Sequence, residues 1–127
     1  MSAAILASMF SSTLLDHFQH PRNAGELPGA NVKVEVRNPV CGDILQLSAT
    51  IENHTVRDVR FLCRGCTASI ASASLLTELL QGREVSELSA ITPESLAALL
   101  GGLPPASFHA VQLAHDALRS LLEKTPK

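Results

Sequence analysis

Residues 45–52 read LQLSATIE, and apolar and polar side chains alternate along the whole stretch. Such a period of two indicates a β-strand with one face in the core and the other toward solvent. The segment VKVEVR at 32–37 alternates in the same way, and a third strand is expected from Val56 to about Cys63. The dipeptide Asn53-His54 separates the second and third segments and is a plausible hairpin turn. The sequence therefore predicts three consecutive strands.

Helical patterns flank the predicted strands. Leu14, Leu15 and Phe18 fit a short amphipathic helix that stops before Pro21, because a proline disfavours helical geometry in the residue before it. The remaining expected segments are a loop over 21–30, a helix over 67–80 ended by Gly82, a short turn over 84–88, a helix opened by Thr92-Pro93-Glu94 and terminated by Gly101-Gly102, and a last helix from Pro104-Pro105 to about Glu123. Strands grouped before helices imply an α+β fold, in which helices pack on one face of a three-stranded antiparallel sheet.

The bulk composition favours one globular domain. Of the 127 residues, 46% are hydrophobic, and the charged fraction is 17%, below the usual value of about 25%. A net charge of −2 leaves no basic excess to neutralise phosphates, and the sequence has no apolar run long enough to span a membrane. We expect a single domain over residues 1–127, with residues 1–11 as a flexible tail and neither nucleic acid nor a membrane as partner.

The N-terminus and the cysteines bear on the cellular compartment. Residues 1–15 are apolar and Ser-rich, but no Lys or Arg precedes the apolar stretch as in a secretory signal; a poorly formed signal peptide stays open as the alternative. The chain has 3 cysteines, and this odd number argues against a disulfide framework. Reduced thiols in the cytoplasm are therefore expected.

Cys41-Gly42-Asp43 lies in the loop between the first two predicted strands. Asp43 has the parity of Leu45, so its carboxylate would face the edge of the core, which is costly unless a cation or a hydrogen-bond donor meets it. An Asp that caps a turn explains the residue equally well when it is taken alone. Cys66 follows the third strand at the start of a helix, where free N–H groups favour the metal-binding thiolate, although a buried apolar cysteine is the common alternative.

Cys41, Asp43 and Cys66 can meet at one end of the sheet, where two thiolates and a carboxylate suit zinc or iron but need a fourth ligand. His109, early in the last helix, is one candidate, because a neutral imidazole binds both metals; a surface histidine is its ordinary alternative. Cys63 is the other candidate.

The segment Cys63-Arg64-Gly65-Cys66 has the spacing of zinc knuckles and of redox pairs. The parity of Cys63 with Val59 and Phe61 fits a core residue equally well, so ligand and core both stay open for it. The other histidines have no spacing that joins them to the site and are expected at the surface or as caps. They are His17, His20, His54 and His115.

Four short motifs occur in order along the chain. They are Asp16-His17-Phe18 with Pro21-Arg22-Asn23 and Gly25; Pro39-Val40-Cys41-Gly42-Asp43; Gly65-Cys66 followed by residues 69–74; and Leu103-Pro104-Pro105 with His109. Together, over roughly residues 14–123, they resemble the iron–sulfur cluster assembly scaffold family of the IscU, NifU N-terminal and SufU type.

The resemblance implies an α+β scaffold of the SufE/NifU-like kind, a binding and transfer protein rather than an enzyme. It implies transient assembly of a [2Fe–2S] cluster from iron, sulfur and electrons, followed by transfer to apo iron–sulfur acceptor proteins. Sulfur would come from a PLP-dependent cysteine desulfurase, and zinc binds at the same residues in members of the family. Carried over by position, the site residues are Cys41, Asp43, Cys66 and His109.

The chain departs from the family pattern at two positions. The family's third cysteine directly follows the position of His109, and here that residue is Ala110. We hypothesise that Cys63 supplies the third thiolate instead. Ser107 stands where the family has a lysine after Leu-Pro-Pro-x, so the segment that the dedicated Hsp70 chaperone reads is incomplete. The chain also lacks the insertion between the second and third motifs that SufU-type members carry.

Other functions fit the same residues. A zinc-loaded protein that accepts persulfide sulfur at Cys41 or Cys66 and activates a desulfurase is the main alternative. A degenerate member that binds metal as a regulator follows from the alanine at position 110. A C-x-x-C oxidoreductase fits less well, because no parallel βαβ pattern surrounds Cys63 and Cys66.

Overall fold

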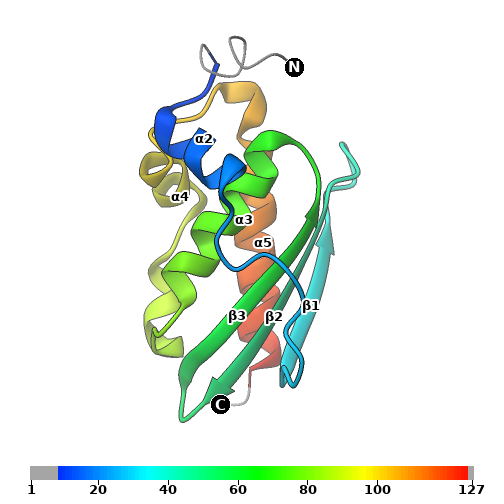
Figure 1. The fold of residues 1–127 in the computed structure, drawn as a ribbon, viewed down its shortest axis with the longest axis vertical. Coiled ribbons are helices and arrows are strands. Elements are labelled where there is room, and N and C mark those ends of the chain that lie inside the picture. Colours follow the sequence, from blue (N-terminus) through cyan, green and yellow to red (C-terminus); the bar gives the residue numbers. More distant parts are fainter. Residues whose placement is uncertain (1–8, 126–127) are drawn as a thin grey trace.

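A three-stranded antiparallel sheet forms one layer of the fold (Figure 1), which the computed structural model describes over residues 9–125. Its order is β1-β2-β3, with β1 at Val32–Arg37, β2 at Ile44–Glu52 and β3 at Thr55–Arg64. Between β2 and β3, Asn53 and His54 adopt positive φ values of 51° and 61°, as the favoured two-residue hairpin turn requires. The predicted strands, hairpin and fold class are confirmed.

Helices cover one face of the sheet (Figure 1). Helix α3, Thr67–Leu80, packs on β3, and helix α5, His109–Lys124, packs on β1 and β2. The alternation of apolar and polar residues along the strands determines which side chains face these helices. The fully or almost fully buried strand residues are Val32, Val34, Leu45, Leu47, Ala49, Val56, Val59 and Phe61. None of the described helices is long and apolar enough to cross a membrane.

The remaining helices lie at the predicted positions, and only the start of α5 differs from the prediction. Helix α2 is Ser12–Gln19, α4 is Pro93–Leu99, and Val85–Ala90 forms a 3₁₀-helix. The last helix was expected from Pro104-Pro105, but Pro105–Ser107 is a separate 3₁₀ turn and α5 begins at His109. Pro104 is extended, with ψ 142°, because a residue that precedes proline avoids helical geometry.

Of the expected N-terminal tail over residues 1–11, residues 1–8 lie outside the described part of the chain, whereas Phe10 and Ser11 contact the rest of the protein. Phe10 is only 9% exposed and belongs to the core. Ser11 caps α2 by accepting a hydrogen bond of 3.0 Å from the Leu14 N–H, and its hydroxyl donates to the Leu100 carbonyl. These contacts tie the chain to the core from Phe10 onward.

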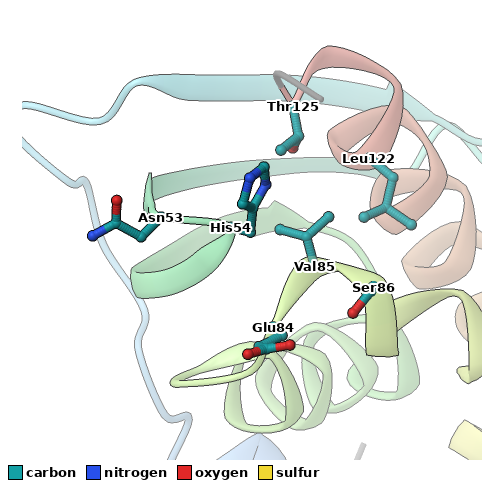
Figure 2. A pocket seen from close by; sticks show the side chains of 7 residues that line it. All are labelled: Asn53, His54, Glu84, Val85, Ser86, Leu122 and Thr125. Carbon is teal, nitrogen blue, oxygen red and sulfur yellow. The ribbon is translucent and has the colours of Figure 1, made fainter.

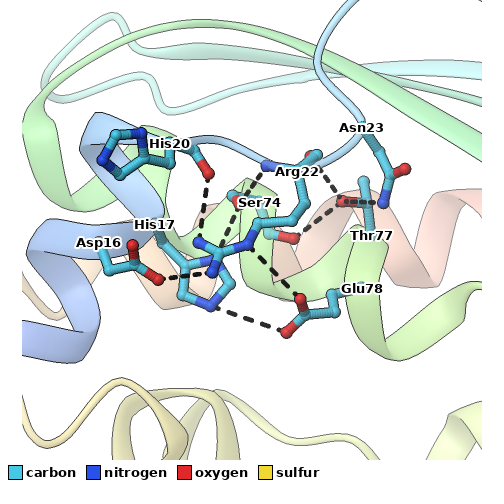
Figure 3. Close-up of polar contacts among 8 residues, drawn as sticks. All are labelled: Asp16, His17, His20, Arg22, Asn23, Ser74, Thr77 and Glu78. Carbon is cyan, nitrogen blue, oxygen red and sulfur yellow. Dashed lines mark hydrogen bonds and ion pairs between the residues drawn. The ribbon is translucent and has the colours of Figure 1, made fainter.

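A polar cluster joins α2 and the following loop to α3 (Figure 3). Arg22 pairs with Asp16 and, at 3.6 Å, with Glu78. Ser74 Oγ accepts the Arg22 N–H at 2.9 Å and lies 2.8 Å from Nδ1 of His17. His17 was expected at the surface or as a cap, but it is 4% exposed, because this cluster provides its polar partners inside the protein.

Candidate metal centre

The loop between β1 and β2 presents Cys41 at the surface. Asn38 Oδ1 accepts hydrogen bonds from the N–H groups of Val40 at 2.9 Å and of Cys41 at 3.3 Å, and the Asn38 carbonyl accepts the Gly42 N–H at 2.8 Å. Gly42 has a φ of +78°, a conformation that glycine adopts without steric cost. Asn38 thus organises the turn, and Cys41 and Val40 are exposed, Val40 to 94%.

Asp43 reaches across to the beginning of α3. Its Oδ2 atom accepts hydrogen bonds from the Ser69 hydroxyl at 2.7 Å and from the Cys66 N–H at 3.3 Å. Cys66 is the N-cap of α3 but makes no side-chain cap of its own. The carboxylate from a distant loop therefore provides the acceptor that an N-terminal N–H group needs.

These hydrogen bonds also set the charge state of Asp43. Partial burial raises the pKa of this carboxyl group, but hydrogen bonds from the Ser69 hydroxyl, the Cys66 N–H and the side chains of Cys41 and Cys66 together outweigh burial, and the pKa lies below its ordinary value of 3.8. Asp43 is only 9% exposed. The site therefore holds a nearly buried carboxylate anion, as predicted from its parity with Leu45.

His109 brings the start of α5 to the same place. Ligand atoms of Cys41, Asp43 and His109 all lie within 4.8 Å of one another, and His109 Nε2 is 4.0 Å from Asp43 Oδ2. Cys66 Sγ lies 3.7 Å from His109 Nε2. Nδ1 of His109 is 3.1 Å from the Ala106 carbonyl oxygen, a contact in which Nδ1 donates and Nε2 keeps its lone pair for a metal.

The donor set fits a zinc or iron ion. Two thiols, one carboxylate and one imidazole are the ligand types that both metals use. Zinc bonds of about 2.3 Å to sulfur and about 2.0 Å to nitrogen at a tetrahedral angle separate the two atoms by about 3.5 Å. The observed 3.7 Å between Cys66 Sγ and His109 Nε2 is close to this separation.

Cys63 has a different environment from the other two cysteines. It is half-buried and packs against the hydrophobic core. Burial, together with the negative charge of Asp43, raises the pKa of its thiol to about 12. The group of ligand atoms within 4.8 Å of one another includes neither Cys63 nor Cys66, but Cys66 Sγ contacts His109 Nε2 at 3.7 Å. Ala110, at the position of the family's third cysteine, is 1% exposed and faces the core.

Two residues of the site, Ser69 and Asn38, were not predicted as site residues, although Ser69 lies in the motif over residues 69–74. Asn38 precedes Pro39, and an Asn before a proline is a recognisable turn signal. Ser69 occurs in a helix rich in Ser and Ala, so its contact with Asp43 depends on the approach of two distant segments and leaves no local signal.

A cavity of about 490 Å³ lies at the hairpin end of the sheet (Figure 2). His54 and Glu84 are among its lining residues, and Val85 and Leu122 supply apolar surface. The cysteines lie at or beyond the opposite end of the strands, since Ile44 pairs with Arg64 there. The cavity is therefore separate from the candidate metal centre.

Sequence comparison identifies relatives along almost the whole chain. Residues 9–126 match the family described as NifU-like N terminal domain. The chain is 40% identical over 111 residues to iron-sulfur cluster assembly scaffold protein IscU 1 of Archaeoglobus fulgidus, which covers 87% of this chain and 72% of that protein. It is 36% identical over 121 residues to iron-sulfur cluster assembly scaffold protein IscU of Aquifex aeolicus, covering 91% and 77%.

Solved structures share the fold. A putative iron-sulfur cluster assembly scaffold protein for the SUF system from Fervidobacterium islandicum aligns with a TM-score of 0.76 at 19% identity, covering 95% of this chain and 99% of that one. A NifU-like protein (N-terminal) from Brucella abortus aligns with a TM-score of 0.70 at 18% identity, covering 91% and 95%. At these identities the likeness concerns the fold alone. The family match and the relatives at 36–40% identity establish that the chain belongs to the NifU-like N-terminal domain family.

Proposed function

We propose that this chain is a scaffold on which an iron–sulfur cluster is assembled and from which it is transferred to apo-proteins. The observation that carries the proposal is the proximity of Cys41, Asp43 and His109 at one end of the sheet, together with the 3.7 Å contact between Cys66 Sγ and His109 Nε2. Relatives at 36–40% identity are named as iron-sulfur cluster assembly scaffold proteins, which supports the same role here. The role is one of binding and transfer rather than of catalysis.

The cargo we propose is a transient [2Fe–2S] cluster, with iron as its precursor and zinc as an alternative occupant of the same residues. Thiolates bind cluster iron strongly, whereas a carboxylate oxygen is a harder ligand and a poorer match to it. Asp43 would therefore keep the cargo labile. The exposure of Cys41 and Cys66 supports transfer, because both sulfurs are accessible from solvent.

The proposed partners are a cysteine desulfurase, which delivers sulfur, and apo iron–sulfur proteins, which receive the cluster. Three free cysteines in the described part of the chain agree with a reducing compartment such as the cytoplasm, although some relatives are named as mitochondrial. Recognition by an Hsp70-type chaperone is not part of the proposal, because Ser107 stands in the place of the family's lysine. The functional unit is a single domain.

A second function is favoured by the alanine at position 110, which leaves the site with two well-placed thiols instead of three. In this alternative the protein holds zinc and accepts persulfide sulfur on Cys41 or Cys66. Mass spectrometry of each cysteine after reaction with a desulfurase and cysteine separates the two functions. Persulfide on a zinc-loaded protein that never gains iron supports the second.

Anaerobic reconstitution tests the scaffold function directly. The purified chain is incubated with ferrous iron, a desulfurase, cysteine and a reductant, and visible absorption and metal analysis follow the product. We expect charge-transfer bands and about two iron atoms for each cluster bound. When an apo-ferredoxin is added, the scaffold should lose these bands and the ferredoxin should gain the bands of its own cluster. Iron that stays colourless, or a cluster that never leaves, would contradict the proposal.

A further inference from the structure

We infer that Ser69 and Gly65 form a seat for the Asp43 carboxylate and that Ser69 is a positioning residue of the metal centre. The inference rests on the proposed metal-binding function and adds two residues that do not themselves bind the metal. It concerns how the one oxygen donor among the four proposed ligands is held in place before metal binding.

The Ser69 hydroxyl makes a shorter hydrogen bond to the carboxylate than the Cys66 N–H does. It donates to Asp43 Oδ2 at 2.7 Å, and Ser69 is only 1% exposed, so water does not compete for this hydrogen bond. A hydrogen bond to an ionised acceptor is about twice as strong as one between neutral groups. The same hydroxyl oxygen lies 3.3 Å from Cys66 Sγ. One hydroxyl thus contacts two of the proposed ligand side chains.

Gly65 provides the space in which the carboxylate lies. A Cβ atom on this residue would approach Asp43 Oδ2 to 2.8 Å and Asp43 Cγ to 2.9 Å, closer than real Cβ contacts, and Ser69 Cβ to 3.1 Å. The φ of Gly65 does not lie in the left-handed region. An alanine there would therefore leave the backbone unstrained and would displace the carboxylate, which is the flexible end of a side chain.

The seat determines where the oxygen ligand lies relative to the other donors. With Oδ2 held by Ser69 and by the Cys66 N–H, the carboxylate lies 4.0 Å from His109 Nε2. Hydrogen bonds to ligating carboxylates orient them, and loss of such a partner typically lowers metal affinity about 10- to 100-fold. We expect Ser69 to contribute to metal affinity mainly through Asp43, because its hydrogen bond of 2.7 Å to the carboxylate is shorter than its 3.3 Å contact with Cys66 Sγ.

Ser72 offers a matched control on the same helix. It is fully buried like Ser69, but its hydroxyl donates to the Ala68 carbonyl at 2.7 Å and contacts no proposed ligand. Ser69→Ala and Ser72→Ala remove the same atom from the same helix at similar burial. Only the first removes a contact of the metal centre.

The experiment measures zinc affinity by competition with a chromophoric chelator, using the full chain and zinc alone. Ser69→Ala and Gly65→Ala should each lower the affinity about 10- to 100-fold, and Ser72→Ala should change it less than about threefold. In an Asp43→Ala background, Ser69→Ala should have almost no further effect, because the group it positions is gone. The ligand-field bands of the cobalt form should shift in Ser69→Ala and stay unchanged in Ser72→Ala.

Equal affinities of Ser69→Ala and Ser72→Ala would overturn the inference, as would an undiminished effect of Ser69→Ala in the Asp43→Ala background or a parent chain that binds no zinc. If Ser69→Ala does not fold, the zinc affinity of Gly65→Ala tests the inference instead, because this variant keeps every hydrogen-bonding group. Zinc binding needs neither sulfur nor a desulfurase. A chain that shows the expected zinc affinities but never holds a cluster would therefore refute the scaffold function and leave the seat intact.

Discussion

Cys66 Sγ lies 3.7 Å from His109 Nε2, although the two residues belong to the starts of α3 and α5. Both helices pack on the same face of the sheet, so their first residues meet beside the loop that carries Asp43. The contact gives the site its second sulfur and its nitrogen. It also means that zinc binding should depend on residues from three separate parts of the chain.

Cys66→Ser should lower zinc affinity by orders of magnitude, because a hydroxyl at this position replaces a thiolate ligand. His109→Ala should lower it at least tenfold for the same reason. Cys63→Ser should change it less than about threefold, since Cys63 is half-buried against the core and its thiol has a pKa of about 12. Chelator competition measures all three affinities. A large effect of Cys63→Ser with a small effect of His109→Ala would instead make Cys63 the missing third thiolate.

Asp43→Ala should slow the transfer of a reconstituted cluster to an apo-ferredoxin, because the substitution removes the hard oxygen ligand that weakens retention. Asp116→Ala, which removes an exposed carboxylate from the middle of α5, is the control and should leave the rate unchanged. Transfer is followed by circular dichroism in the visible range. Equal transfer rates for the parent and Asp43→Ala would remove the proposed role of the carboxylate.

The strands and helices were predictable because their signals are local. The alternation over 45–52, the turn residues Asn53-His54 and the cap at Thr92 each act within a few neighbours, and the structure confirms them. The start of α5 was misplaced by a few residues. Two consecutive prolines favour a helix start but also force Pro104 into an extended conformation, and the sequence does not say which effect decides.

The site was predictable only in part, because its hydrogen bonds join segments that are distant in sequence. Cys41, Asp43 and Cys66 have side chains that can bind metals, so each is recognised as a candidate ligand from the sequence alone. Gly65 and Ser69 lie in one of the four motifs, but no role could be assigned to them, since one is a loop glycine and the other is a serine among several in a helix. Their importance follows only from the approach of Asp43 to the start of α3.

Thr92→Ala should lower the free energy of unfolding by about 1 kcal/mol. Thr92 Oγ1 accepts the Ser95 N–H at 3.0 Å and Ser95 Oγ accepts the Thr92 N–H at 2.9 Å, so the substitution leaves an N–H group at the start of α4 without its partner. Thr92→Ser keeps the acceptor and should cost less than half as much. Urea unfolding at constant pH measures both, and equal losses for the two variants would show that the cap is unimportant.

His17 should make the stability of the protein fall as the pH drops below about 6.5. Burial lowers the pKa of this imidazole from its ordinary value of 6.5, and the positive charge of Arg22 lowers it further, while Glu78 and Asp16 partly oppose the shift. Because the folded-state pKa lies below the unfolded value, the unfolded chain binds more protons between the two. This contribution to stability is complete above the unfolded pKa and is lost as the pH falls through the folded one.

A comparison of His17→Gln with His20→Gln isolates this effect. Glutamine can still hydrogen-bond to Ser74 but cannot titrate, whereas His20 is exposed and its side chain has no partner in the polar cluster. Urea unfolding at pH 7.5 and pH 5.5 should show a smaller loss of stability in His17→Gln than in the parent, and the parent's full loss in His20→Gln. If His17→Gln loses as much as the parent, the acid sensitivity arises from other groups, because the only change between the two proteins is the buried imidazole.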